Sequence, residues 1–278
     1  MRIKLPKLSF FQIGIFLIAL FILFLAFVPI LTMLLLSLKS TVQIYNNFFA
    51  FPNPPQWGNY NKAIGMLIPN MINTLIVVSI GTLLTVLLCL MSGYSFAKLN
   101  YPFKNVLFIG IIALMMVPGV LLLTPQYMLI QKYGIYNTWA SLILPWAAGG
   151  QIFGIILTRT SMSQLPHEMF EAARIDGCGE FQALVRIALP LSKPILSTIA
   201  VMNMVAFYND FIWPLLAIQT NSKQVINVVI RVFQSVTGSI DLGSMIAGFV
   251  FATLPLLLLF IFTSRLYIEG ITSGAVKG

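Results

Sequence analysis

Long runs without charge are the feature that most constrains this chain. No charged residue occurs between Lys7 and Lys39, or between Lys62 and Lys98. A helix needs about 20 mostly apolar residues to cross the hydrocarbon core of a bilayer, where every backbone polar group must find a partner within the protein. With 59% hydrophobic and 8% charged residues, the 278-residue chain also has too little polar surface to cover a soluble globule. We therefore expect an all-α, polytopic membrane protein.

Six segments are long and apolar enough to span the membrane. They are predicted at Phe10–Leu38, Met71–Phe96, Val106–Leu123, Thr138–Thr158, Pro194–Ala217 and Ser244–Tyr267. The first follows basic residues, as a signal peptide would, but it is too long and lacks a small-residue cleavage site, so we expect it to remain as a helix. No internal repeat or linker marks a second domain. The sequence thus predicts one transmembrane domain over residues 1–278.

The distribution of basic residues predicts the orientation of these spans. One side receives Arg2, Lys4, Lys7, Lys98, Lys104, Arg159, Arg174, Arg186, Lys193, Arg265 and Lys277. The other receives Lys39, Lys62, Lys132, Lys223 and Arg231. Because cytoplasmic loops are enriched in Lys and Arg, both termini and the loop of residues 159–193 are expected in the cytoplasm. On the opposite face, Lys39–Pro69 is rich in Pro, Asn and aromatic residues, which predicts an interfacial loop.

The loop of residues 159–193 gathers four of the seven acidic residues of the chain, namely Glu168, Glu171, Asp176 and Glu180. Two short helices are predicted in it. The first starts at Pro166 and stops at Gly177, which tolerates a left-handed conformation, and the second covers Glu180–Leu189 up to Pro190. Asp176 lies at the end of the first helix where the helix dipole disfavours a negative charge. Either the loop is simply solvated, or a partner requires that charge.

A spaced motif favours the partner. Glu171-Ala172-Ala173, Gly177, Ile187 and Leu189-Pro190 stand at the spacing of the EAA signature, and the loop resembles that of binding-protein-dependent ABC importer permeases. The resemblance implies a type I importer permease with six transmembrane helices, in which residues 159–193 form a cytoplasmic coupling loop that docks on an ATP-binding subunit. The docking residues it implies are Glu168, Glu171, Ala172, Ala173, Arg174, Asp176 and Gly177.

Two further stretches resemble the smaller permease subunit of maltose-type carbohydrate importers. One is the C-terminal tail, with Gly274, Val276 and Lys277. The other is Tyr208–Pro214, similar to a WNDFLWP run but with Tyr in place of the first Trp. The resemblance implies half of the pore of a sugar or oligosaccharide importer in the cell (inner or plasma) membrane. The partners it implies are membrane lipid, a second homologous permease subunit, two ATP-binding cassette subunits, an extracytoplasmic solute-binding protein and the sugar.

The chain lacks the residues it would need to act alone. No G-x-x-x-x-G-K-[ST] motif occurs, so ATP and magnesium are expected on the ATPase subunits, with no cofactor bound by this chain. A single histidine, His167, cannot build a metal site, and we expect neither a metal nor enzymatic activity. Basic residues are scattered singly, so no nucleic-acid partner is expected.

Other transport classes remain to be distinguished from a carbohydrate importer. A permease for another small solute, such as a polyamine, a phosphonate or glycerol phosphate, would carry a similar EAA loop. An ion-coupled secondary transporter is disfavoured by the absence of an inverted repeat and of an acid-rich core. A membrane-embedded enzyme is disfavoured because one histidine and one membrane acid offer almost no catalytic equipment.

Tyr208, Asn209 and Asp210 fall within the predicted fifth span. A charged aspartate at the centre of a membrane helix costs about 2.5 to 3.5 kcal/mol, so Asp210 is expected to face protein or water rather than lipid. Two roles remain open for it. It lines the translocation path with Asn209, or it fixes the fifth helix against a neighbour. We prefer the packing role, because polar side chains commonly join membrane helices.

Overall fold

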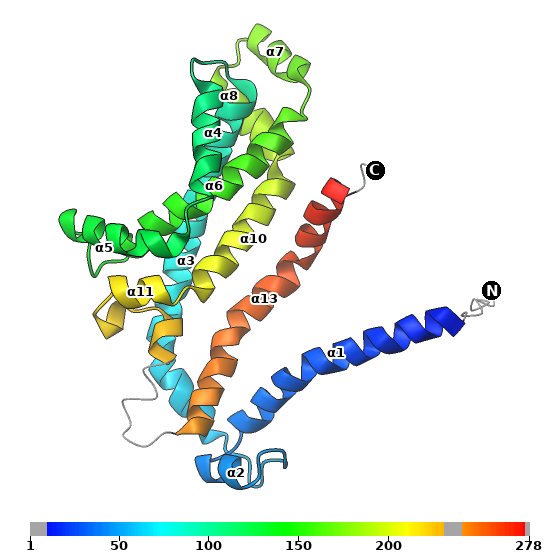
Figure 1. Cartoon of the computed structure of the whole chain (residues 1–278), viewed down its shortest axis with the longest axis vertical. Coiled ribbons are helices and arrows are strands. Elements are labelled where there is room, and N and C mark those ends of the chain that lie inside the picture. The colour runs from blue at the N-terminus through cyan, green and yellow to red at the C-terminus, as the bar shows by residue number, and fades with distance from the viewer. Residues whose placement is uncertain (1–9, 231–240, 276–278) are drawn as a thin grey trace. The chain divides into compact units, whose positions relative to one another are not determined.

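Helices make up all the regular structure in the described residues, 10–230 and 241–275, of the computed structural model, as the all-α prediction requires (Figure 1). Side chains of the last helix are described as far as residue 263. The chain divides into two compact units. Unit 1 comprises Met1–Leu67 with Val232–Thr253, and unit 2 comprises Ile68–Arg231 with Leu254–Gly278. Two long helices, α3 (Gly58–Lys98) and α13 (Leu242–Ala275), contribute to both.

Unit 1 begins with α1 (Phe10–Ser37), which is apolar on all sides and ends one residue before the predicted first span does. Lys39 follows it and is 1% exposed. Its Nζ donates hydrogen bonds to the carbonyl oxygens of Asn47, at 2.8 Å, and Phe48, at 2.9 Å. A buried ammonium group needs such acceptors. Lys39 therefore fixes the segment that follows α1.

The predicted interfacial loop Lys39–Pro69 is helical over much of its length, which corrects that prediction. α2 (Thr41–Asn46) begins after Ser40, whose side chain forms a reciprocal capping box with Gln43. α3 begins at Gly58, well before the predicted start of the second span. The first turn of α3 is tied to the end of α1, because Asn59 Nδ2 donates to the carbonyls of Ser37 and Lys39 at 2.8 and 2.9 Å.

Unit 2 holds the remaining helices. In chain order they are α4 (Lys104–Leu114), η1 (Gly119–Leu122), α5 (Leu123–Lys132), α6 (Ala140–Ser163), α7 (His167–Ile175), α8 (Glu180–Ala183), the π-helical η2 (Leu184–Ala188), α9 (Leu189–Leu191), α10 (Lys193–Asn209), α11 (Ile212–Ala217) and η3 (Asn221–Lys223). α6 packs against α4, α10 and α11. α7 and α8 lie at one end of this unit, and α5 and α11 lie away from them (Figure 1).

Glycine allows α3 and α6 to cross closely. A Cβ atom added to Gly93 of α3 would lie 2.6 Å from the Cβ of Thr158 on α6, closer than carbon atoms can approach. One turn earlier on each helix, a Cβ added to Gly154 of α6 would lie 2.4 Å from the Cys89 sulfur. Small residues of this kind let membrane helices gain packing contacts that larger side chains would prevent.

Four helices are each long and apolar enough to cross a membrane, namely α1, α3, α6 and α13. Two bent pairs reach that length only when each pair is taken as one span: Lys104–Leu114 with Gly119–Lys132, bent by 97°, and Glu180–Leu191 with Lys193–Asn209, bent by 78°. The described residues thus provide four spans, or up to six if each bent pair is one span.

The third predicted span, Val106–Leu123, is wrong as a continuous helix. α4 stops at Leu114, and the chain turns through residues 115–118 before η1 begins. Pro118 lies four residues after Leu114. In a continuous helix its ring would collide with the Leu114 carbonyl and leave that carbonyl without an N–H donor. The proline accounts for the position of the break.

Candidate functional site

The segment around the EAA motif forms a short helix with a defined stop, as the sequence predicts. α7 begins directly after Pro166 and is followed by Gly177, whose φ of +80° is left-handed. The Cys178 amide donates to the Ala173 carbonyl at 2.8 Å, and the Gly177 amide donates to the Arg174 carbonyl at 3.0 Å. This pair of bonds is the Schellman motif, which satisfies the last carbonyls of a helix and favours glycine at the left-handed position.

The second helix of the loop continues beyond its predicted end. From Glu180 to Leu191 the backbone stays helical through α8, η2 and α9, and the break falls at Ser192 instead of Pro190. Pro190 lies in α9, inside this continuous helical stretch. The π-helical turn Leu184–Ala188 directly precedes α9, and such turns and prolines are the usual places where a helix departs from regular geometry.

Most of the residues assigned to docking lie on the exposed face of α7 and at its end. Glu168, Glu171, Ala172, Arg174, Asp176 and Gly177 are exposed, and Ala173 is half-buried. Beside them, the side chain of Ile175 is 87% exposed. Exposed apolar and acidic side chains therefore occur together on α7 and at its end.

The opposite face of α7 is anchored to α3 by Phe170. This side chain is 1% exposed, and its ring centre lies 6.0 Å from that of Tyr94 on α3. Lys98 Nζ lies 4.8 Å from the same ring centre and donates a hydrogen bond to the Leu165 carbonyl at 2.7 Å. Burying one phenylalanine side chain stabilises by about 1.5 to 3 kcal/mol. α7 is thus attached to the bundle and is not a free loop.

Glu180 connects three elements at the base of α7. Its Oε1 accepts a hydrogen bond from Arg174 Nε at 2.8 Å, and its Oε2 accepts one from the Tyr94 hydroxyl at 2.7 Å. The hydrogen bond to Glu180 raises the pKa of the Arg174 guanidinium, which stays charged. Because the two side chains of the ion pair are 44% and 46% exposed, the pair contributes at most about 1 kcal/mol to stability. It fixes geometry more than it adds stability.

These anchoring residues were not predicted from the sequence. Tyr94 and Lys98 lie in or next to the apolar segment Met71–Phe96, where nothing marks them as partners of the loop, and Phe170 lies within the loop itself. Glu180 follows Arg174 by six residues, and the left-handed Gly177 lies in the turn between the two side chains.

Asp210 lies at a helix break and not inside a continuous helix, which corrects its predicted placement. α10 ends at Asn209, Asp210 is extended (φ −65°, ψ 128°), and α11 contains Pro214. Pro214 is four residues beyond Asp210, so a continuous helix would set its ring against the Asp210 carbonyl. The Asp210 side chain uses the break. Its Oδ1 accepts from the Trp213 amide at 3.3 Å, in the manner of a helix cap.

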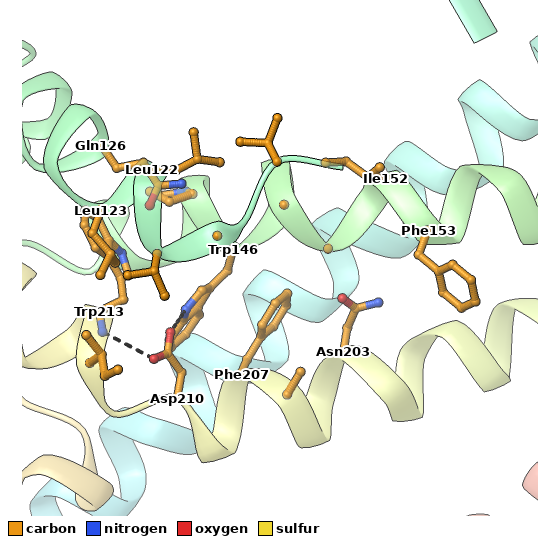
Figure 2. A pocket seen from close by; sticks show the side chains of 18 of the residues that line it. Leu122, Leu123, Gln126, Trp146, Ile152, Phe153, Asn203, Phe207, Asp210 and Trp213 are labelled. Carbon is orange, nitrogen blue, oxygen red and sulfur yellow. Dashed lines mark hydrogen bonds between the residues drawn. The ribbon is translucent and has the colours of Figure 1, made fainter. Parts of the chain in front are cut away.

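Asp210 also joins α10 to α6. Its Oδ2 accepts a hydrogen bond from Trp146 Nε1 at 2.7 Å (Figure 2). The ring of Trp146 stacks on that of Phe207, with centres 5.1 Å apart and planes within 5°. Both aromatic side chains are buried. The Asp210 carboxylate therefore adds a hydrogen bond to a contact between α6 and α10 that otherwise consists of stacked aromatic rings.

Tyr208 and Asn209, the residues before Asp210, make contacts different from those of Asp210. Tyr208 is buried, its hydroxyl lies 3.7 Å from the Met71 sulfur of α3, and its carbonyl accepts a hydrogen bond from the side-chain amide of Asn227. Asn209 is exposed and bonds its own helix, from Nδ2 to the Val205 carbonyl at 2.9 Å. The three residues thus do not form one cluster.

An open groove of about 810 Å³ runs beside this contact. It is formed by the α4–η1–α5 bend, α6, α10 and the start of α11, and its lining is mostly apolar. Its polar lining residues include Gln126, Asn203 and Asp210 (Figure 2). Asn209 also lines it. Asn203 approaches α6 so closely that a Cβ on Gly150 would lie 2.2 Å from its Oδ1. Within the described part of the chain, no group of three or more His, Cys, Asp or Glu residues is arranged to hold a metal.

One of the three predicted tail residues is among the described residues. Gly274 is in the last turns of α13, whereas Val276 and Lys277 lie outside the described residues.

Comparison with known proteins identifies relatives that are similar in sequence over most of this chain. The trehalose/maltose transport system permease protein MalG of Thermococcus litoralis is 32% identical over 206 residues, covering 74% of each chain. The arabinooligosaccharides transport system permease protein AraQ of Halalkalibacterium halodurans is 28% identical over 264 residues, covering 93% of this chain and 94% of that protein.

A solved structure has the same fold. One chain in the crystal structure of a bacterial ABC transporter for import of the acidic polysaccharide alginate superposes with a TM-score of 0.82, covering 95% of this chain and 99% of its own, at 16% identity. The family of binding-protein-dependent transport system inner membrane components matches residues 86–268. That match covers α4 to α11, including α7 and the groove, and the chain belongs to this family of multi-pass membrane components of transport systems.

Proposed function

We propose that this chain is the transmembrane subunit of an ATP-driven importer for a sugar or oligosaccharide, and that it couples to ATPase subunits through α7. The main observation in support is that one face of α7 is exposed and bears acidic and apolar side chains, while its other face is anchored to α3 by Phe170. In this proposal residues 1–278 form one permease domain, with six spans if each bent pair crosses once. Both termini and residues 159–193 are cytoplasmic, and the tail with Gly274, Val276 and Lys277 belongs to that side.

The geometry of α7 suits a joint that transmits force. A partner groove that closes on the exposed face can pair cations with Glu171 and Asp176, while Ala172 permits close backbone approach. Phe170 and Glu180 then pass the displacement to α3, because they hold α7 to Tyr94 on that helix. ATP and magnesium belong to the partner ATPase subunits. A second permease subunit and a solute-binding protein outside the membrane complete the importer.

The substrate class is supported by relatives named for carbohydrates. One relative is named for trehalose and maltose and another for arabinooligosaccharides. The two names differ in sugar and in chain length, so the class is transferred to this chain and the particular sugar is not.

For Asp210, the contacts support the packing role. Both carboxylate oxygens already accept hydrogen bonds from the chain itself, one from Trp146 and one from Trp213. A sugar hydroxyl would have to share these acceptors. Asn209 and Gln126, which open onto the groove, are better placed to meet a solute.

The substrate class is tested by reconstituting the full complex in vesicles with its binding protein and measuring ATP-dependent uptake. We expect uptake of an oligosaccharide and none of polyamines, phosphonates or glycerol phosphate. Uptake of one of these solutes in place of every sugar tested would overturn the carbohydrate assignment while leaving the importer assignment intact.

Docking is tested by reversing one charge on α7. Glu171→Lys should release the ATPase subunits, since like charges in a confined groove cost several kcal/mol. The measurement is the amount of ATPase that co-purifies after a high-salt wash. Gln182→Lys on α8 is the matched control, because it adds positive charge to an exposed position off α7 and should retain the ATPase. Equal retention by Glu171→Lys and the control would exclude Glu171 from docking.

The anchor is tested by Glu180→Gln, which weakens the bonds to Arg174 and Tyr94. Stability should change by no more than about 1 kcal/mol, because the ion pair is largely exposed. Transport per ATP hydrolysed should fall, with the ATPase still bound. Tyr94→Phe removes one of the two bonds and should give a smaller loss. An unchanged ratio of transport to hydrolysis in both variants would show that the anchor does not transmit motion.

For Asp210, two substitutions separate packing from solute binding. Asp210→Asn keeps an acceptor for Trp146 and should be mild. Asp210→Leu should lower complex stability by roughly 1 to 2 kcal/mol, the scale of a lost hydrogen bond between membrane helices. Thermal unfolding and uptake are measured on both variants. Normal unfolding together with altered substrate preference would place Asp210 in the solute path.

A further inference from the structure

A second pocket, apart from the groove, opens where α4 begins. It has a volume of about 550 Å³ and lies between the end of α3, the start of α4 and the last turns of α6. The residues with polar side chains that line it are Asn100, Tyr101, Lys104, Asn105, Arg159 and Ser163. The start of α4 and the last turns of α6, which line the pocket, lie at the end of unit 2 at which α7 lies (Figure 1).

Two cations share this pocket without an acid. Within the described ranges, no carboxylate lies within ion-pair distance of Lys104 or Arg159. Lys104 Nζ donates to the Leu99 carbonyl at 2.7 Å, which uses one of its three donors. The Arg159 guanidinium carbon lies 3.8 Å from the centre of the Phe108 ring, and its buried Nε has no hydrogen-bond partner. Two like charges in one pocket are stabilised by an anion between them.

The start of α4 adds further donors. Phe103, the residue before the helix, has a left-handed φ of 61°, and no side chain caps the helix. The first backbone bond of the helix joins the Leu107 amide to the Phe103 carbonyl at 2.9 Å. The amides of residues 104–106 precede that bond, and an uncapped helix N-terminus of this kind attracts phosphate and other anions.

We propose that this pocket binds the phosphate group of an anionic membrane lipid. The phosphate would meet Lys104, Arg159 and the first amides of α4. A lipid is favoured over soluble phosphate by the surface that adjoins the pocket. Val106, Leu107 and Ile109 of α4 are exposed and apolar, and the Phe103 ring is exposed beside them. Acyl chains can follow that surface, and aromatic side chains mark headgroup depth in membrane proteins.

Such a lipid would act close to α7. Arg159 lies in the last turn but one of α6, and the Ser163 hydroxyl donates to its carbonyl at 2.8 Å. α7 begins four residues after Ser163. The lipid would therefore hold the end of α6 that leads into the proposed coupling joint. The site itself needs only membrane insertion, so it does not rest on the carbohydrate assignment.

The test measures lipid retention by the intact, purified transporter complex. The complex is delipidated, incubated with equal amounts of phosphatidylglycerol and phosphatidylcholine, and analysed by native mass spectrometry. We expect the wild type to prefer phosphatidylglycerol. Lys104→Gln and Arg159→Gln should each lower this preference about fivefold, the scale of one basic residue near an anionic headgroup. Lys193→Gln removes the same charge from an exposed position outside the pocket and should leave the preference unchanged.

Further measurements distinguish the loss of a charge from a folding defect, and distinguish lipid binding from the binding of soluble phosphate. Arg159→Lys keeps the charge and should retain most of the preference even if the contact with Phe108 is weakened. Millimolar inorganic phosphate should not displace the lipid, and displacement would assign the pocket to a soluble anion. Equal retention of the two lipids by the wild-type complex would overturn the proposal. Lys104 and Arg159 would then be expected to contact an acidic group of a protein partner.

Discussion

The fold depends on one constraint, that backbone polar groups at membrane depth must find partners within the protein. Continuous helices such as α1 and α6 meet it directly. Two interruptions beside the groove, after Leu114 and at Asp210, have to meet it another way. At Asp210 the side chain receives the Trp213 amide and the Trp146 indole, so the break is turned toward α6 and not toward lipid. The interruptions both border the groove, and irregular backbone of this kind is tolerated at membrane depth where it lines a cavity or lies against protein.

Charge-free runs and motif spacing predicted the helical class and the placement of α7, because both depend on local residues. The breaks were missed, although Pro118 and Pro214 each lie four residues beyond one. Proline alone would not have identified them. Pro29, Pro69, Pro145 and Pro255 all lie inside helices. Whether a proline bends a helix or ends it depends on what surrounds it in the folded chain, which the local sequence does not specify.

The candidate site likewise has features that the local sequence predicts and features that depend on distant contacts. The exposed acids and the left-handed glycine of the EAA motif are local properties, and the sequence predicted where they would lie. The direction of Arg174 is not local. Sequence reasoning placed it with the docking residues, whereas in the structure its Nε donates to Glu180. A guanidinium has five donors, so an outward contact from the remaining nitrogens would share the side chain with the internal ion pair. Its docking role stays a prediction, and any partner must accept the geometry that Glu180 imposes.

Two attachments therefore hold α7 at its end of unit 2. Phe170 and Glu180 hold α7 to α3 through Tyr94, whereas α6 reaches α7 through the short segment of residues 164–166. A push on α7 would be shared between these two helices, in proportion to how firmly each is held. α3 and α6 cross closely at Gly93 and Thr158, so neither end can move far without the other. An anion between Lys104 and Arg159 would join α4 to this pair and stiffen the support against which α7 is displaced.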